Sequence, residues 1–234
     1  MTKATLYVFH GSPKTTCFQE MTALGEELIA ETNELSEIAF LAHATNTIPQ
    51  QARSLAAKGA EEIYLQPVLL QPAVHFHRDL PKIAAQENEL GISFQIGECI
   101  GDAPAVLNAL RTQIETIDEP NACCVLLAHG SCKYPEVEER LRQLIGVLQK
   151  TSPVPIWDSY LLTNQHKRSF EERIDRLAQR YSHVFILPYF IFYGHLLEKI
   201  AKIVDDRKKK EKRVTLMETL DLAKVKQALL KERG

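Results

Sequence analysis

The chain has 234 residues, with 28 Lys and Arg against 30 Asp and Glu, so its formal charge is −2. Hydrophobic residues make up 45% of the sequence, which excludes disorder of the whole chain. The balanced charge argues against a dedicated nucleic-acid-binding protein, because such proteins carry a clear basic excess. The length suits one large domain or two small ones.

The apolar segments are too short to cross a membrane. The longest, residues 184–194, contains Pro188 and is about half as long as the roughly 20 residues that a spanning helix needs. The N-terminus lacks the basic and apolar regions of a secretory signal. The five cysteines form neither a C-x-x-C motif nor a disulfide pattern. We therefore expect reduced thiols, a cytoplasmic location and no membrane partner.

The first half of the sequence predicts alternating strands and helices. Short apolar runs predict strands at residues 4–9, 38–41, 61–70 and 92–96. Helical spacing predicts helices that start near Thr16, Pro49 and Asp79, and a fourth over residues 106–117. We expect Thr16 and Gln19 to form a capping box, and Asp79 to cap the third helix. Gly59 is placed to end the second helix.

The second half repeats this alternation. We expect strands at residues 123–128, 156–161, 183–192 and 214–217, and helices at 136–149, 170–180, 196–205 and 222–232. His10-Gly11-Ser12 returns as His129-Gly130-Ser131, 119 positions later. A second match relates Pro67 and Pro188, 121 positions apart. Two matches in nearly the same register indicate two related halves with parallel sheets, joined near residues 118–121.

Several nucleotide and hydrolase motifs are absent from the sequence. It contains no G-x-x-x-x-G-K-[ST] and no G-x-G-x-x-G, so we expect no nucleotide cofactor. It also lacks the G-x-S-x-G motif of a serine hydrolase. The charged run at residues 205–213 is interpreted as a solvated helix end and loop.

Histidines follow the predicted strand ends, where parallel sheets bind ligands. In the first half these are His10, His43, His75 and His77; in the second half they are His129 and His195. Neutral imidazole binds divalent iron, cobalt, nickel and zinc. One such histidine alone is typical of a hydrogen-bonded loop, but several at one sheet edge favour a metal or proton-transfer site in the first half. His166 and His183 are interpreted as surface or structural residues, and Cys123 and Cys124 as core.

Four segments of the chain resemble the sirohydrochlorin chelatase family, which includes ferrochelatases and cobaltochelatases. They are His10-Gly11-Ser12; Phe40-Leu41 with Thr47-Ile48-Pro49; Pro67–Leu70 through His75 to Asp79-Leu80-Pro81; and Pro188–Gly194. The resemblance covers nearly the whole chain. It implies an α/β fold with two similar chelatase-like domains of class II type, at residues 1–118 and 122–234. Each would be a parallel four-stranded sheet flanked by helices, with the active crevice between the two.

The resemblance also implies an activity and its residues. The chain would insert Fe2+ or Co2+, or Ni2+, into sirohydrochlorin for sirohaem or cobalamin biosynthesis, as a monomer or homodimer. His10 and His75 would be the catalytic and metal-handling residues. The family's carboxylate position holds Ala42 here, so His43 is a candidate third ligand, and in the second half Leu196 replaces a histidine.

Basic residues near the strand ends suit the carboxylates on the rim of sirohydrochlorin. Those we expect to contact it are Lys14, Arg78, Lys82 and Lys133, together with the hydroxyl of Ser12. Two other functions stay open. One is a metal- or tetrapyrrole-binding carrier without turnover, which Ala42 favours. The other is a phosphate-handling hydrolase with His10 as nucleophile, although Phe9 stands where such enzymes commonly have Arg.

Overall fold

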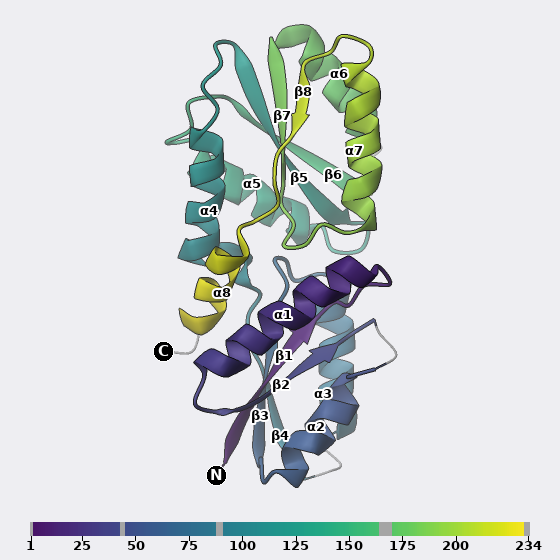
Figure 1. The fold of residues 1–234 in the computed structure, drawn as a ribbon, viewed down its shortest axis with the longest axis vertical. Coiled ribbons are helices and arrows are strands. Elements are labelled where there is room, and N and C mark those ends of the chain that lie inside the picture. Colours follow the sequence, from purple (N-terminus) through teal and green to yellow (C-terminus); the bar gives the residue numbers. More distant parts are fainter. Residues whose placement is uncertain (1, 43–44, 88–90, 164–169, 232–234) are drawn as a thin grey trace. The chain divides into compact units, whose positions relative to one another are not determined.

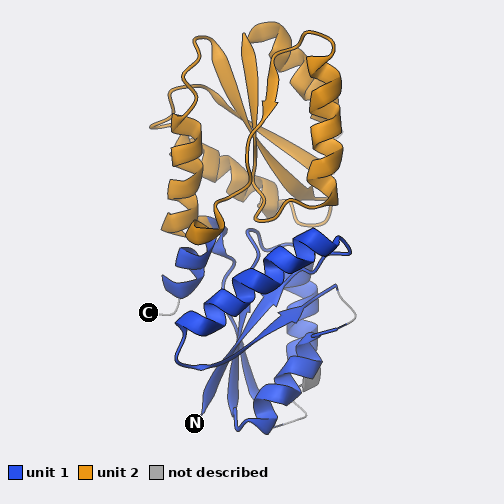
Figure 2. Ribbon diagram, in the orientation of Figure 1, with its two compact units in different colours: residues 1–101, 225–234 blue, residues 102–224 orange. Residues whose placement is uncertain are grey.

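The computed structural model of the chain describes residues 2–42, 45–87, 91–163 and 170–231. It divides into two compact units (Figure 2). Unit 1 contains residues 1–101 and 225–234, and unit 2 contains residues 102–224. Each unit holds one four-stranded sheet, so the alternation of strands and helices read from the sequence is confirmed.

Unit 1 contains a parallel sheet in the strand order β2-β1-β3-β4 (Figure 1). Its strands are β1 (Lys3–Phe9), β2 (Leu35–Phe40), β3 (Glu62–Pro67) and β4 (Ser93–Ile96). The helices that follow them are α1 (Thr15–Glu31), α2 (Ile48–Ala57), the π-helix His75–Asp79, α3 (Leu80–Glu87) and the 3-10 helix Ile100–Asp102. Connections through helices make every strand pair parallel, as expected for βαβ units.

Alternate residues of β1 form the core of unit 1. Leu6 and Val8 are fully buried and pack in the same cluster as Leu55 of α2 and Leu80 of α3. The other face of the strand carries Phe9, which is also fully buried. Because both faces of β1 are covered, the strand is a continuous apolar run.

The helix ends of unit 1 agree only partly with the sequence. The capping box of α2 joins Thr47 and Gln50, and Gly59 follows the end of this helix with φ of 94°, as predicted. The predicted box at Thr16 is wrong. Helix α1 begins at Thr15, so Thr16 is already helical, and the residue before the helix, Lys14, makes no side-chain capping bond.

Unit 2 repeats the topology, with strand order β6-β5-β7-β8. The strands are β5 (Ala122–Ser131), β6 (Ile156–Thr163), β7 (His183–Pro188) and β8 (Val214–Leu216). Its helices are α4 (Pro104–Glu115), α5 (Glu136–Leu148), α6 (Phe170–Arg180) and α7 (His195–Lys208). The chain then continues into α8 (Leu222–Lys231), which begins in unit 2. The internal repeat inferred from the two His-Gly-Ser segments therefore corresponds to a repeated fold.

The two compact units differ from the predicted domains of residues 1–118 and 122–234 in the placement of two helices, and those domain bounds stay a prediction. Helix α4 comes from the first half of the sequence but belongs to unit 2, where Gln113 donates to the carbonyl of Glu218 at 3.0 Å. Most of α8 belongs to unit 1, where Lys226 lies 2.8 Å from Glu27 of α1. Apolar spacing determines which helix face is buried, but not which sheet that face covers.

Two strands are clearly shorter than predicted, and β5 is the strand that is lengthened most. β3 and β7 end at Pro67 and Pro188, whose lack of an N–H suits the end of a ladder. β5 was expected to end at residue 128 but continues through His129, because β6 pairs beside it as far as Ser131.

The charged run at residues 205–213 is only partly solvated, which differs from the prediction. Arg207 is only 9% exposed and pairs with Glu171 at 2.9 Å and Asp175 at 3.2 Å. Lys212 also reaches Asp175, at 2.8 Å. Arg207 therefore holds the last turn of α7 against α6, and Lys212 holds the segment that follows it.

Three further predictions concern two cysteines, His183 and membrane-spanning helices. Cys123 and Cys124 are fully buried free thiols, as predicted, and burial raises the pKa of each to about 12. His183 is structural, because one ring nitrogen contacts Glu119 and the other contacts Thr215. Within the described ranges, no helix combines the length and apolarity needed to cross a bilayer.

Candidate functional site

His10 follows the last residue of β1 and is held by a tight backbone turn. Gly11 has φ of 88°, in the left-handed region that favours glycine. A Cβ atom at Gly11 would lie 3.0 Å from the carbonyl oxygen of Ala42. The N–H of Ala42 in turn donates to the carbonyl of His10 at 2.8 Å. The segment after β2 therefore packs closely on the His-Gly turn and fixes the position of His10.

His75 begins the π-helix that precedes α3. The N–H of Leu80 donates to the carbonyl of His75, five residues earlier, which is the pattern of a π-turn. Pro81 follows immediately and has no backbone N–H, so it cannot donate the regular helical hydrogen bond. The π-turn therefore lies just before the position where that hydrogen bond is missing. The turn starts the helix earlier than predicted.

The structure brings His10 and His75 together. Their ring centroids lie 4.5 Å apart, and the ring planes meet at 82°, which is an edge-to-face arrangement. His10 is exposed, and the side chain of His75 is 35% exposed. The pair is therefore open to ligands, at the carboxyl edge of the unit 1 sheet.

Hydrogen bonds fix the same ring nitrogen in both histidines. Nδ1 of His10 lies 2.9 Å from the carbonyl oxygen of Gly11, and Nδ1 of His75 lies 2.7 Å from Oδ2 of Asp79. A carbonyl or an ionised carboxylate can only accept, so Nδ1 carries the proton in each neutral ring. Each Nε2 then has a lone pair that can bind a metal ion or accept a proton.

The environment of His75 favours its neutral form. Burial and the neighbouring His10 lower the pKa of His75, and they outweigh the opposing effect of Asp79. Because a protonated imidazole cannot bind a metal, this shift extends the pH range over which His75 can act as a ligand.

Asp79 contacts His75 and Arg78 instead of capping a helix. It was expected to cap a helix, but it lies inside the helical segment and accepts from His75. Its other oxygen, Oδ1, accepts from Nε of Arg78 at 2.7 Å. The hydrogen bond from Arg78 is the main reason why the pKa of Asp79 is lowered. The spacing of four residues between His75 and Asp79 was the available signal.

The expected substrate-contacting residues have different local roles in the structure. Oγ of Ser12 accepts from the backbone N–H of Lys14 at 3.1 Å, so Ser12 shapes the loop after His10. The basic side chains of Arg78 and Lys82 lie on exposed positions of the helical segment that starts at His75. Arg78 is 59% exposed even though it pairs with Asp79.

A third metal ligand is not identified. Among the residues that the structure describes, no three His, Cys, Asp or Glu side chains are grouped to hold a metal ion. The predicted candidate, His43, lies outside those residues. The ring of His77 lies 5.3 Å from that of Phe76, in an edge-to-face arrangement.

The second half retains part of this arrangement. Nδ1 of His129 lies 3.2 Å from the carbonyl of Gly130, as in the first half. Oγ of Ser131 accepts from the N–H of Lys133 at 3.2 Å. His195 pairs with Glu198 at 2.9 Å on the first turn of α7, and its side chain is 74% exposed.

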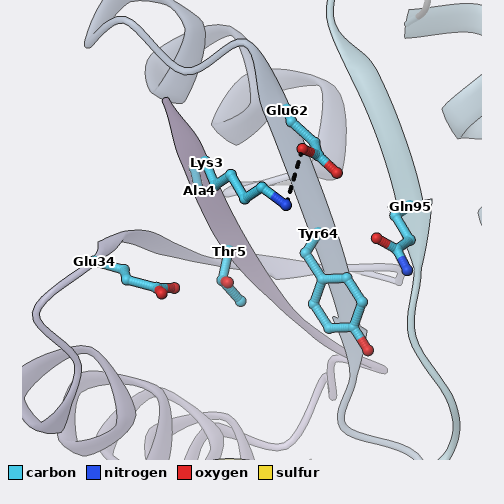
Figure 3. A pocket seen from close by; sticks show the side chains of 7 residues that line it. All are labelled: Lys3, Ala4, Thr5, Glu34, Glu62, Tyr64 and Gln95. Atoms are coloured by element: carbon cyan, nitrogen blue, oxygen red, sulfur yellow. Dashed lines mark ion pairs between the residues drawn. The ribbon is translucent and has the colours of Figure 1, made fainter. Parts of the chain in front are cut away.

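A separate polar cavity of about 290 Å³ lies at the opposite edge of the unit 1 sheet (Figure 3). It is lined by the first residues of β1 and by β3, β4 and the segment before β2, namely Lys3, Ala4, Thr5, Glu34, Glu62, Tyr64 and Gln95. Lys3 and Glu62 form an ion pair within it. No histidine or cysteine is among these residues, so the cavity is distinct from the His10–His75 pair.

The sequence is similar to known proteins along most of its length. The CbiX family model matches residues 4–117 and again residues 123–234. The chain is 30% identical to a sirohydrochlorin ferrochelatase of Bacillus subtilis over 220 residues, which cover 89% of this chain and 81% of the relative. It is 28% identical to a sirohydrochlorin cobaltochelatase of Priestia megaterium, over 88% of this chain and 70% of that protein.

A solved structure extends the similarity to the fold. SirB from Bacillus subtilis, solved with Fe3+, superposes with a TM-score of 0.85 and is 28% identical. The match covers 100% of this chain and 94% of the other.

Proposed function

The chain belongs to the CbiX family, and we propose that it is a sirohydrochlorin chelatase, an enzyme that inserts Fe2+ or Co2+ into sirohydrochlorin. Relatives named as a ferrochelatase and a cobaltochelatase match most of its length. The proposal extends to Ni2+ as a metal that the same imidazole ligands accept. The product would serve sirohaem or cobalamin biosynthesis.

The observation that carries the proposal is the His10–His75 pair. The two rings lie 4.5 Å apart, and both Nδ1 atoms are held by acceptors. Two neutral Nε2 atoms provide two ligands, which leave coordination positions open for the nitrogens of the macrocycle. We assign both histidines to metal handling within the first half of the chain, residues 1–118.

Insertion of a divalent ion releases two protons from the pyrrole nitrogens. The lowered pKa of His75 suits it to the ligand role, because its ring stays neutral below the ordinary pKa. His10 is exposed, so a proton accepted by its ring can pass directly to solvent. We propose that His75 holds the ion and that His10 shares in binding it. Once the ion has passed to the macrocycle, Nε2 of His10 is free to accept the two released protons one after the other and to pass each to solvent.

Basic residues would bind the carboxylates on the substrate's rim. Arg78 and Lys82 lie on exposed positions of the segment that carries His75, and Lys14 follows the loop that carries His10. Ser12 supports this loop through its bond to the N–H of Lys14. These four residues would orient the macrocycle over the two imidazoles.

The second candidate is a carrier that binds metal or tetrapyrrole without turnover. Ala42 favours it, because a side chain without a carboxylate stands beside His10. A cytoplasmic location, as a monomer or homodimer, is proposed for either function. The five free cysteines favour such a reducing location.

A turnover assay separates the two functions. Sirohydrochlorin and Co2+ or Fe2+ are mixed with protein at one-twentieth of the substrate concentration, and the absorbance spectrum is followed. A chelatase converts many equivalents faster than the protein-free mixture. A carrier changes the spectrum by no more than one equivalent and does not accelerate insertion.

Three variants locate the activity. We expect His10→Ala and His75→Ala each to slow insertion by about 100-fold or more. His129→Ala is the matched control, because His129 has the same local turn in the second half. Full activity in both His10→Ala and His75→Ala would contradict the site assignment.

A further inference from the structure

We infer that Asp79 is a positioning residue, which holds His75 in the tautomer that directs a lone pair at the metal ion. This inference rests on the proposed role of His75 in metal handling. It adds a residue that does not itself touch the metal or the macrocycle. It also explains why a carboxylate lies inside the helix that starts at His75.

The side chains of His75 and Asp79 are in direct contact. Nδ1 of His75 and Oδ2 of Asp79 are 2.7 Å apart, which is short for a hydrogen bond between nitrogen and oxygen. An ionised carboxylate has no proton to give, so the imidazole must donate from Nδ1. Nε2 of the neutral ring is then free of a proton. A carboxylate in this position also increases the electron density that the ring offers to a metal.

A second hydrogen bond holds the carboxylate of Asp79 in place. Oδ1 of Asp79 accepts from Nε of Arg78 at 2.7 Å, so its two oxygens serve two different donors. The hydrogen bond from Arg78 fixes the rotation of the carboxylate. The side chain of Asp79 is 24% exposed and that of Arg78 is 59% exposed, so the orientation depends on these bonds rather than on burial.

His10 and His75 differ in the kind of group that accepts from Nδ1. The acceptor for Nδ1 of His10 is the backbone carbonyl of Gly11, which no side-chain substitution removes. The tautomer of His75 depends instead on one side chain. Asp79 is therefore the position at which the ligand state of the pair can be altered without changing either histidine.

The test uses Asp79→Asn in the full-length protein. The amide has nearly the shape of the carboxylate, but it can donate as well as accept, so both tautomers of His75 become possible. We expect the affinity for Co2+, measured by calorimetry with the metal alone, to fall about 10- to 100-fold. Long-range proton–nitrogen NMR of histidine-labelled protein reports the tautomer, with His75→Ala used to assign the signal.

Glu198→Gln provides the matched control. Glu198 accepts from Nδ1 of His195 at 2.9 Å in the second half, so this variant makes the same chemical change at a histidine outside the proposed site. Its Co2+ affinity and insertion rate should equal those of the unmodified protein. The urea midpoints of both variants show whether the fold is retained.

Two results would overturn the inference. One is an NMR result in which the neutral ring of His75 carries its proton on Nε2 in the unmodified protein. This measurement does not depend on whether a variant folds. The other is Asp79→Asn with a Co2+ affinity within twofold of the unmodified protein. If the unmodified protein binds Co2+ through His75 but inserts no metal, the proposed turnover fails while the role of Asp79 stands.

Discussion

The imidazole rings of His10 and His75 meet edge to face, with their centroids 4.5 Å apart. His10 is positioned by a glycine turn at the end of β1, and His75 by a π-turn after β3. β1 and β3 are neighbours in the sheet, so their carboxyl ends bring the two segments together. Parallel strand order therefore creates the pair from positions that are distant in sequence.

The lowered pKa of His75 predicts how the protein responds to acid. Burial and the neighbouring His10 lower this pKa below the ordinary value of 6.5. We expect NMR titration of the His75 ring to give a midpoint below 6.5. The unfolded chain binds this proton at higher pH than the folded protein. The His75 contribution to the free energy of unfolding is therefore present above pH 6.5 and lost as the pH falls through the folded-state pKa. A midpoint above 6.5 would contradict the description of the site.

Gly11→Ala should damage both stability and activity. Its φ of 88° is unfavourable for alanine, and the new Cβ would lie 3.0 Å from the carbonyl oxygen of Ala42. We expect a loss of about 1–3 kcal/mol in urea unfolding, together with slower insertion, because the turn that holds His10 must shift.

Gly59→Ala is the control for that experiment. Gly59 has φ of 94°, but a Cβ there would meet no atom within 4 Å. We expect a cost of about 1–2 kcal/mol from the backbone alone, with insertion unchanged. Equal activity in the two variants would show that the contact with Ala42 is unimportant.

Ala42→Glu should strengthen metal binding. The N–H of Ala42 donates to the carbonyl of His10, so a longer side chain at this position starts beside the proposed site. A carboxylate would add an oxygen ligand and a negative charge. We expect the affinity for Co2+ to rise about tenfold, which corresponds to about 1.4 kcal/mol. Ala42→Gln has the same size without the charge, and an equal gain in that variant would refute the explanation.

Arg207→Met should destabilise unit 2. Arg207 is 9% exposed and pairs with Glu171 and Asp175. Since both partners are partly exposed, water can reach them when the arginine is lost, so we expect a cost of about 1–3 kcal/mol rather than more. Lys209→Ala removes an exposed pair with Asp206 and should change the free energy of unfolding by less than about 0.5 kcal/mol. Urea unfolding distinguishes the two variants.

The sequence was sufficient to predict the alternating fold and the convergence of His10 and His75. Short apolar runs marked the strands, and the parallel order placed their ends at one edge. The exchange of α4 and α8 between the units could not be predicted, because a helical pattern does not specify the sheet that a helix covers.

The local chemistry of the site was harder to predict. Asp79 was predicted to cap the third helix, but the π-turn extends the helix back to His75 and turns the carboxylate toward that ring. Arg207 was interpreted as solvated because its neighbours in sequence are charged, whereas its partners lie on α6. In both cases the deciding contact comes from the tertiary structure or from an unusual turn.

X-ray absorption spectroscopy of the Co2+ complex tests most directly whether His10 and His75 hold the ion together. We expect two imidazole nitrogens from this pair to bind Co2+ in the unmodified protein. We expect one imidazole ligand to be lost in His10→Ala and one in His75→Ala. The same number of imidazole ligands in all three proteins would contradict it.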